Sequence, residues 1–117
     1  MHKFYIEKNK NSFEFTVNKR QVNKYKALST SVLFDKVEYI AKSSIFPYND
    51  ILEEIPKSFE LNFVQNAYLN DELIVENQIK KLSNSDLELL VKVSKKQSVK
   101  NEIICEAVFG YTFKRAS

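Results

Sequence analysis

The chain is poor in the residues that break or cross-link a protein backbone. Its 117 residues include one glycine, two prolines, one cysteine and one histidine, and no tryptophan. The single cysteine, Cys105, cannot form an intrachain disulfide, and it lies in an apolar run where we expect it to be buried. We therefore expect a reducing compartment, and turns that depend on asparagine, aspartate and serine.

Long hydrophobic runs are also missing. Nowhere do about 18 uncharged apolar residues follow one another, which argues against a transmembrane helix. The first residues contain no apolar segment long enough for a signal peptide. We therefore expect a cytoplasmic protein with no membrane partner.

Neither sign of charge dominates. The formal net charge is +3, from 18 basic and 15 acidic residues, and the basic residues are spread along the chain, so we expect no nucleic-acid partner. Short basic pairs could each meet a phosphate or an acidic carrier protein, although such pairs more often lie in solvated turns. These pairs are Lys19-Arg20, Lys80-Lys81 and Lys95-Lys96. The one histidine, His2, is terminal, and without a ligand cluster we expect no metal and no cofactor.

Apolar and aromatic residues are abundant. They make up 44% and 13% of the chain, which is too much apolar surface for a disordered segment to leave in water. A chain of this length needs only one core. We therefore predict a single domain over residues 1–117.

The segment from Leu28 to Ile45 is predicted to be a helix. Ser29 is a plausible N-cap, with its hydroxyl accepting from a first-turn amide, and Pro47 should end the helix near Phe46. Further apolar residues widen the buried face, so this helix should contact protein on more than one side. The residues at helical spacing are Leu33, Val37, Ile40, Ala41 and Ile45.

Strands are predicted on both sides of this helix. Before it, alternating residues between positions 4 and 17 predict a hairpin or one broken strand around the polar residues 9–12. After it, the period changes to two, and the short breaks between runs predict antiparallel neighbours. These runs cover 59–63, 73–79, 87–93 and 102–113, and the last is apolar enough to be central.

This order of elements fits two α+β architectures. In the hotdog arrangement, a curved antiparallel sheet of about five strands wraps one long central helix. In a cystatin-like arrangement, the sheet packs against one face of the helix only. The extended segment before the helix and the wide apolar face favour the hotdog fold.

The residues from 62 to 95, NFVQNAYLNDELIVENQIKKLSNSDLELLVKVSK, resemble the strand, turn and strand pattern of the hotdog-fold thioesterase superfamily. That superfamily includes acyl-CoA, acyl-carrier-protein and hydroxybenzoyl-CoA thioesterases. EIICEAVFGYTF resembles its closing strand, and the apolar helix with Ala41 resembles its buried central helix. The most specific matches are Leu69, Asp71, Glu72 and Leu73. The resemblance covers residues 12–113 and implies a dimer whose sheets join edge to edge, with thioester sites near the helix N-termini at the subunit boundary.

The histidine motifs that precede the helix in many members of the superfamily are not present in this chain. Val22-Asn23 matches part of one such motif, His-Val-Asn-Asn, with Gln21 in the place of its histidine. The glycines of the other motif, His-Gly-Gly, are absent. The resemblance therefore leaves the catalytic group to be found elsewhere in the chain.

Thioester hydrolysis needs a base or nucleophile, and donors for the oxygen that becomes negative. We expect Asp35 or Glu38, on the helix, to act as the base. The amides of the first helical turn would form the oxyanion site, helped by the positive end of the helix dipole. The residues expected to contact the substrate are Asn23, Tyr25, Ser29, Thr30 and Ser31.

The two carboxylates also have a purely structural interpretation. Asp35 and Glu38 can instead be the solvated edge of the helix, with Glu38 and Lys42 forming an i,i+4 pair worth a few tenths of a kcal/mol. The leading function is an acyl-CoA or acyl-carrier-protein thioesterase. The alternatives are a non-catalytic hotdog subunit that binds acyl chains or pairs with an active partner, and an acyl-thioester dehydratase, for which His2 is badly placed.

Overall fold

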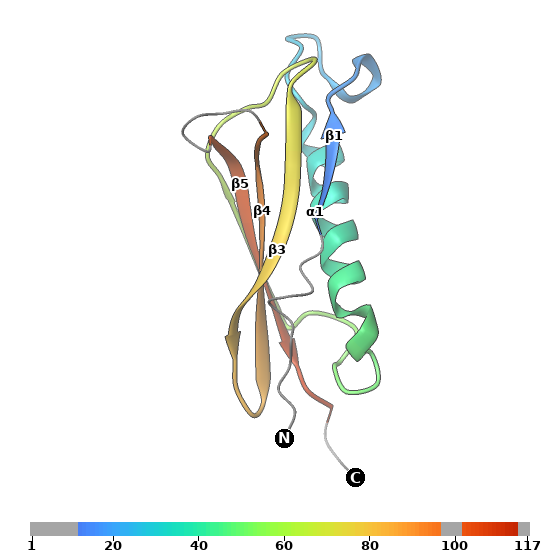
Figure 1. Cartoon of the computed structure of the whole chain (residues 1–117), viewed down its shortest axis with the longest axis vertical. Helices are drawn as coiled ribbons and strands as arrows, with labels where there is room; N and C mark the ends of the chain where they lie inside the picture. The colour runs from blue at the N-terminus through green and yellow to red at the C-terminus, as the bar shows by residue number, and fades with distance from the viewer. Residues whose placement is uncertain (1–11, 97–101, 115–117) are drawn as a thin grey trace.

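The computed structural model describes residues 12–96 and 102–114 and contains one long helix and a five-stranded antiparallel sheet (Figure 1). The predicted strand around Phe4 and Ile6, and His2, lie outside the described residues. Two short 3-10 helices, η2 and η3, flank the long helix α1. The bounds are β1 Ser12–Thr16, η2 Lys19–Gln21, α1 Thr30–Ile45, η3 Phe46–Tyr48, β2 Ser58–Phe63, β3 Glu72–Leu82, β4 Asp86–Lys95 and β5 Ile103–Thr112.

The helix begins and ends where the sequence predicts. Ser29 occupies the N-cap position with an extended backbone, and the helix stops at Ile45, after which η3 begins at Phe46 and contains Pro47. The predicted cap bond is wrong, however, because the Ser29 hydroxyl lies 2.9 Å from the Ser31 hydroxyl and caps no amide. In the described part of the chain, no helix is both long and apolar enough to cross a membrane.

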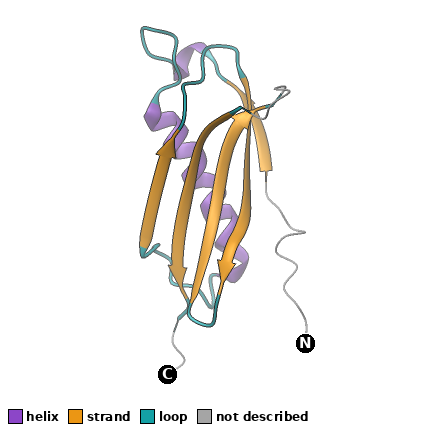
Figure 2. Ribbon diagram, turned by 90° about the vertical axis from the view of Figure 1, so that its left-hand side faces the viewer, coloured by secondary structure: helices purple, strands orange, loops and turns teal. Residues whose placement is uncertain are grey.

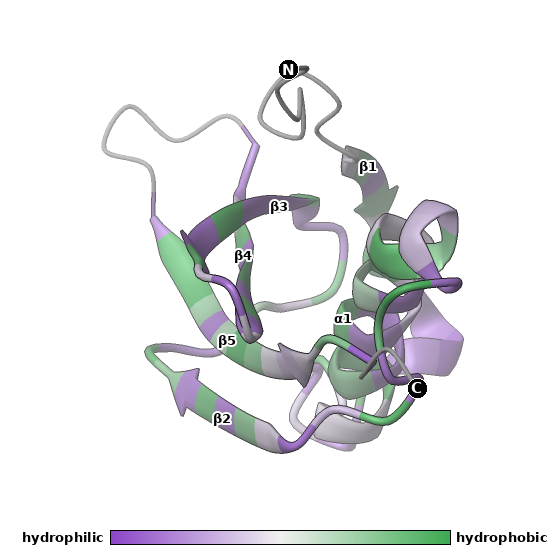
Figure 3. Cartoon of the chain, turned by 90° about the horizontal axis from the view of Figure 1, so that it is seen from below, coloured by the Kyte–Doolittle hydropathy of each residue, from purple (hydrophilic) through white to green (hydrophobic). Residues whose placement is uncertain are grey.

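The sheet curls around α1, as the hotdog arrangement requires. Seen end-on, the strands form an arc with the helix on its concave side (Figure 3). Both edge strands reach the helix: the Phe13 ring of β1 lies 5.8 Å from that of Tyr39, and the Phe59 ring of β2 lies 5.6 Å from that of Phe34. A sheet packed on one helix face could not make both contacts, so the cystatin-like alternative is excluded.

The core fills the space between α1 and the inner strands. Each large aliphatic side chain buried there stabilises the folded state by roughly 1.5–3 kcal/mol relative to leaving it exposed to water. The helix supplies the five apolar residues predicted from its spacing, and β3, β4 and β5 supply alternating ones. The most deeply buried large side chains include Leu33, Val37, Ile40, Leu73, Val75, Leu89, Val91, Val93, Ile104 and Tyr111.

One strand has a different neighbour from the one predicted. The order β1-β3-β4-β5-β2 makes β5 an inner strand, as expected, but places β2 beside β5 rather than beside β3 (Figure 2). The prediction that a short break joins neighbouring strands is wrong here, because the link between β2 and β3 does not form a hairpin. Its backbone bonds instead to the segment before α1, with Leu28 N–H donating to Ala67 O at 2.8 Å and Asn70 N–H donating to Val17 O at 2.8 Å.

The outer face of α1 remains open. Tyr39, which widened the apolar face in the sequence, is 64% exposed, and Asp35 and Lys42 are exposed beside it. The sheet therefore covers the back and both flanks of the helix, and leaves one polar and aromatic stripe facing solvent.

Candidate functional site

The loop before α1 is an ordered structure built from reciprocal hydrogen bonds. Asn18 caps η2 by accepting from Arg20 N–H at 2.9 Å, and Gln21 Oε1 accepts from Asn18 N–H at 2.9 Å, which is a capping box. The backbone of Ser29 donates to Gln21 O at 2.8 Å. These bonds hold Gln21 directly beside the start of the helix.

Asn23, predicted to contact substrate, shapes the same loop. Its side-chain oxygen accepts from the amides of Tyr25 and Ala27 at 2.8 and 3.1 Å, which is the turn chemistry typical of asparagine. Tyr25 projects from this turn and is 72% exposed, with the Lys24 ammonium 5.2 Å from its ring centre. The structure therefore gives Asn23 a part in holding the turn that carries Tyr25.

The first turn of α1 presents amide donors that have no partner in the part of the chain that the structure describes. Among the described residues, no acceptor bonds the amides of Thr30, Ser31 or Val32, since the Ser29 hydroxyl is engaged with Ser31 and Leu33 N–H is the first amide bonded back, to Ser29 O. These amides lie at the positive end of the helix dipole. This turn can therefore bind a carbonyl or an anionic oxygen.

A hollow of about 390 Å³ opens beside this turn, between α1 and β1. The Asp35 carboxylate is exposed at its side, and Gln21 reaches it from η2. Because Gln21 Oε1 is held by Asn18 N–H, its amide group offers hydrogens rather than an acceptor. The hollow is lined by Phe13, Gln21, Val32, Asp35, Lys36 and Tyr39.

Gln21 is the site residue that sequence reasoning missed. Its place opposite the family's histidine was the available signal, but neither spacing nor composition shows that it shares a hollow with Asp35. A carboxylate and an amide donor on one hollow can hold a water and a carbonyl together, which is the arrangement that hydrolysis requires.

Glu38 lies about one helical turn after Asp35, on the same polar stripe of α1. It does not line the hollow beside Asp35, and its carboxylate is 3.8 Å from the Lys42 ammonium, in the i,i+4 geometry, with the Glu38 side chain 42% exposed. Burial, with a smaller contribution from the Glu38 charge, raises the pKa of Tyr111 to about 12. Of the two carboxylates that the sequence proposed as alternative bases, only Asp35 therefore lines this hollow.

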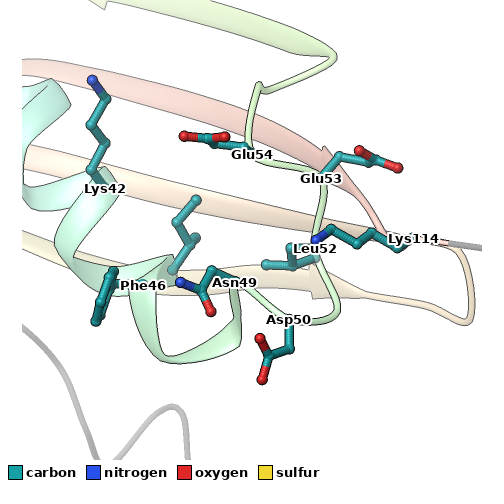
Figure 4. Close-up of a pocket in the computed structure, with 9 residues that line it drawn as sticks. Lys42, Phe46, Asn49, Asp50, Leu52, Glu53, Glu54 and Lys114 are labelled. Atoms are coloured by element: carbon teal, nitrogen blue, oxygen red, sulfur yellow. The ribbon is translucent and has the colours of Figure 1, made fainter.

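A second hollow, of about 460 Å³, lies at the C-terminal end of α1 (Figure 4). It is larger, but the helix end there presents carbonyl oxygens and the negative end of the dipole. Three carboxylates, of Asp50, Glu53 and Glu54, line it beside the two ammonium groups of Lys42 and Lys114, so the lining has one more negative than positive charge. Negative charge developing on a thioester oxygen would be destabilised in this hollow, so the N-terminal hollow is the better candidate for hydrolysis.

The remaining reactive groups of the described residues do not form a site. Cys105, in β5, is fully buried, and burial raises the pKa of its thiol to about 11, which keeps it protonated and unreactive near neutral pH. Residues 12–96 and 102–114 contain no group of three or more histidine, cysteine, aspartate or glutamate side chains that could hold a metal ion.

Comparisons with known proteins show which solved structures share this fold. No family model and no curated protein matches the sequence. Among solved structures, the chain is similar to an acyl-CoA hydrolase from Staphylococcus aureus in complex with butyryl coenzyme A, with a TM-score of 0.79 and 12% identity over 94% of this chain and 66% of that one. It is similar to a hypothetical thioesterase from Streptococcus pneumoniae with coenzyme A, with a TM-score of 0.72 and 14% identity over 90% and 81%.

Zebra fish thioesterase superfamily member 2 is a third structural relative, with a TM-score of 0.73 and 13% identity over 90% of this chain and 75% of that chain. At these identities the likeness concerns the fold. A vertebrate and two bacterial thioesterases share one arrangement of helix and sheet with this chain. The chain therefore has the hotdog fold of the thioesterases that its sequence resembles.

Proposed function

We propose that the chain hydrolyses acyl thioesters in the hollow beside the first turn of α1. The observation that carries the proposal is that Asp35 and Gln21 line one hollow next to helix amides that have no partner among the described residues. A base, a side-chain donor and a dipole end are the groups that thioester hydrolysis needs.

Each group has a distinct role in this proposal. The Asp35 carboxylate takes a proton from water as that water attacks the thioester carbonyl. The amides of Thr30 and Ser31, after the N-cap Ser29, bind the oxygen as it becomes negative, and Gln21 donates to the same oxygen or to the attacking water. The thiolate then leaves, so one water is consumed and a carboxylic acid and a thiol are formed.

The substrate is proposed to be an acyl-CoA or acyl-carrier-protein thioester, with no cofactor. Solved relatives in complex with coenzyme A, acetyl coenzyme A and butyryl coenzyme A support a CoA thioester. The rings of Phe13 and Tyr39, together with Val32, give the hollow an apolar wall for an acyl group. Tyr25 and the turn held by Asn23 belong to the loop that is bonded to the start of the helix through Ser29 and Gln21.

A homodimer belongs to the same proposal. Strand β2 is an edge strand whose outer side pairs with no described strand. Its Phe59, Leu61 and Phe63 are exposed, and an exposed apolar edge of this kind favours pairing with another strand. A second copy joined at β2 would extend the sheet and cover these side chains.

A substrate panel with two matched variants tests the proposal. Acyl-CoA and acyl-carrier-protein thioesters are incubated with the wild type, Asp35→Asn and Glu38→Gln, and the released thiol is measured. Loss of the general base in Asp35→Asn should lower kcat by about 10²–10⁴-fold, whereas Glu38→Gln should stay near wild type. An equal fall in kcat in both variants, or a fall only in Glu38→Gln, would contradict the role given to Asp35.

The second candidate is a non-catalytic hotdog subunit. The observation in its favour is that Asp35 is exposed to solvent, whereas catalytic carboxylates are commonly tuned by burial. Binding of an acyl-CoA without turnover of any member of the panel would support this candidate. Turnover that depends on Asp35 would exclude it.

A further inference from the structure

The loop from Asn18 to Lys26, here called the basic loop, carries an unbalanced positive charge. It contains four cations, and no acidic residue occurs between Val17 and Phe34. All four side chains are exposed at the end of the molecule where α1 begins (Figure 1). The cations are Lys19, Arg20, Lys24 and Lys26.

None of these four cations has a carboxylate partner among the described residues. The ion pairs of residues 12–96 and 102–114 involve Lys42, Lys57, Lys95 and Lys96, and none involves a cation of the basic loop. The positive end of the α1 dipole adds to the same field, because Ser29 N–H bonds Gln21 O. The loop therefore offers an anionic partner four clustered positive charges that no carboxylate offsets.

The basic loop is also held in a defined shape. Asn23 O accepts from Lys26 N–H at 2.9 Å, and Lys26 O accepts from Leu69 N–H at 2.9 Å, while Lys26 itself has a φ of 66°. Together with the capping box around η2, these bonds fix the backbone on which the cations stand. A preorganised surface loses less conformational entropy when a partner binds.

The shape of this surface indicates the size of the partner. Small-ligand sites are concave, but neither the hollow beside Asp35 nor the hollow at the end of α1 is lined by any cation of the basic loop. Two exposed tyrosines accompany the cations: Tyr25, and Tyr68, which is 47% exposed and precedes Leu69, whose N–H donates to Lys26 O at the loop's end. Tyrosine and arginine on a protruding surface are typical of protein interfaces.

We infer that the basic loop docks the acidic face of a protein that carries the acyl group, and so delivers the thioester to the first turn of α1. This inference rests on the proposed function and names the partner of the same site. The loop and the hollow share Gln21, whose side-chain oxygen is bonded within the loop and which also lines the hollow. Attraction by opposite charge would raise the rate of encounter, and salt would weaken it.

Two variants that each remove two positive charges test the inference. Arg20→Gln/Lys24→Gln changes the basic loop, and Lys80→Gln/Lys81→Gln changes exposed lysines of β3 outside the loop. Hydrolysis of one acyl group is measured on an acidic acyl carrier protein, on coenzyme A and on pantetheine, at two ionic strengths. The loop variant should lose on the order of tenfold in kcat/KM with the carrier protein only, and salt should reduce the wild-type value in the same way.

Several outcomes would overturn the inference. An equal fall in kcat/KM in the loop variant and the β3 variant would show a general effect of charge. A fall in kcat/KM confined to acyl-CoA would show that the loop binds nucleotide phosphates. If no thioester is hydrolysed, binding of the fluorescently labelled carrier protein still tests the surface, because it does not depend on turnover. Binding that is unchanged by Arg20→Gln/Lys24→Gln, or absent in the wild type, would refute the docking role separately from the catalytic proposal.

Discussion

Gln21 makes a capping bond in this structure and is proposed to donate to the substrate, and the substitution Gln21→Glu separates these two roles. The side-chain oxygen of Gln21 accepts from Asn18 N–H at 2.9 Å, and Gln21 also lines the hollow beside Asp35. Glutamate keeps an oxygen for the capping bond and removes the hydrogens that Gln21 would donate. It also adds negative charge close to the place where the thioester oxygen becomes negative.

The expected effect on activity is large and the effect on folding is small. Removal of one oxyanion donor lowers kcat by about 10²–10³-fold in well-studied hydrolases. The capping bond survives in Gln21→Glu, so its free energy of unfolding should stay near wild type, whereas Gln21→Ala should lose about 1 kcal/mol. Thiol release from an acyl-CoA gives kcat, and urea unfolding gives the stability. Full activity in Gln21→Glu would refute the role of Gln21 as a donor.

Three further predictions concern the scaffold. Ser44→Ala should destabilise the protein by about 1–3 kcal/mol in urea unfolding, because the buried Asn77 loses the hydroxyl that joins it to α1; an unchanged midpoint would contradict this. The Cys105 thiol, with a pKa raised to about 11, should react with a thiol reagent at pH 8 only after unfolding, so rapid labelling of the native protein would be the contrary result. Gly110→Ala should change the free energy of unfolding by less than about 1 kcal/mol, because the new Cβ overlaps only the exposed Ser58 hydroxyl, which can rotate away; a loss of about 3 kcal/mol or more would contradict this.

The sign of the alkaline pH dependence follows from Cys105 and Tyr111. Burial raises the folded-state pKa of each, from 9.0 to about 11 and from 10.0 to about 12. The stabilisation is therefore complete below the ordinary pKa values and is lost as the pH rises through the folded values. Urea unfolding between pH 8 and pH 11 should show falling stability, and constant stability over that range would contradict the burial of both groups.

Much of the fold was predictable because one side of each element is buried. The spacing of Leu33, Val37 and Ile40 predicted the core face of α1, and Pro47 predicted its end. The alternation in the four later runs predicted β2 to β5. The position of β2 was not predictable, because the hydrogen bonds of the link after it go to the segment before α1. The number of residues between two segments does not show which of them will be hydrogen bonded to each other.

The candidate site was predictable only in part. The free amides of the first turn follow from where the helix begins. The choice between Asp35 and Glu38 does not follow from spacing, because both belong to the polar stripe of α1 and only the hollow that Asp35 lines distinguishes them. Gln21 joins the site through bonds to Asn18 and Ser29, which are visible only in three dimensions.

The most direct test of the account is a crystal structure of the chain with an acyl-CoA analogue whose thioester is replaced by an uncleavable group that keeps the carbonyl. The account predicts the carbonyl oxygen within hydrogen-bond distance of the amides of Thr30 or Ser31, with Gln21 and Asp35 beside it. A ligand seated instead in the hollow at the C-terminal end of α1, with the first turn facing solvent, would contradict the account.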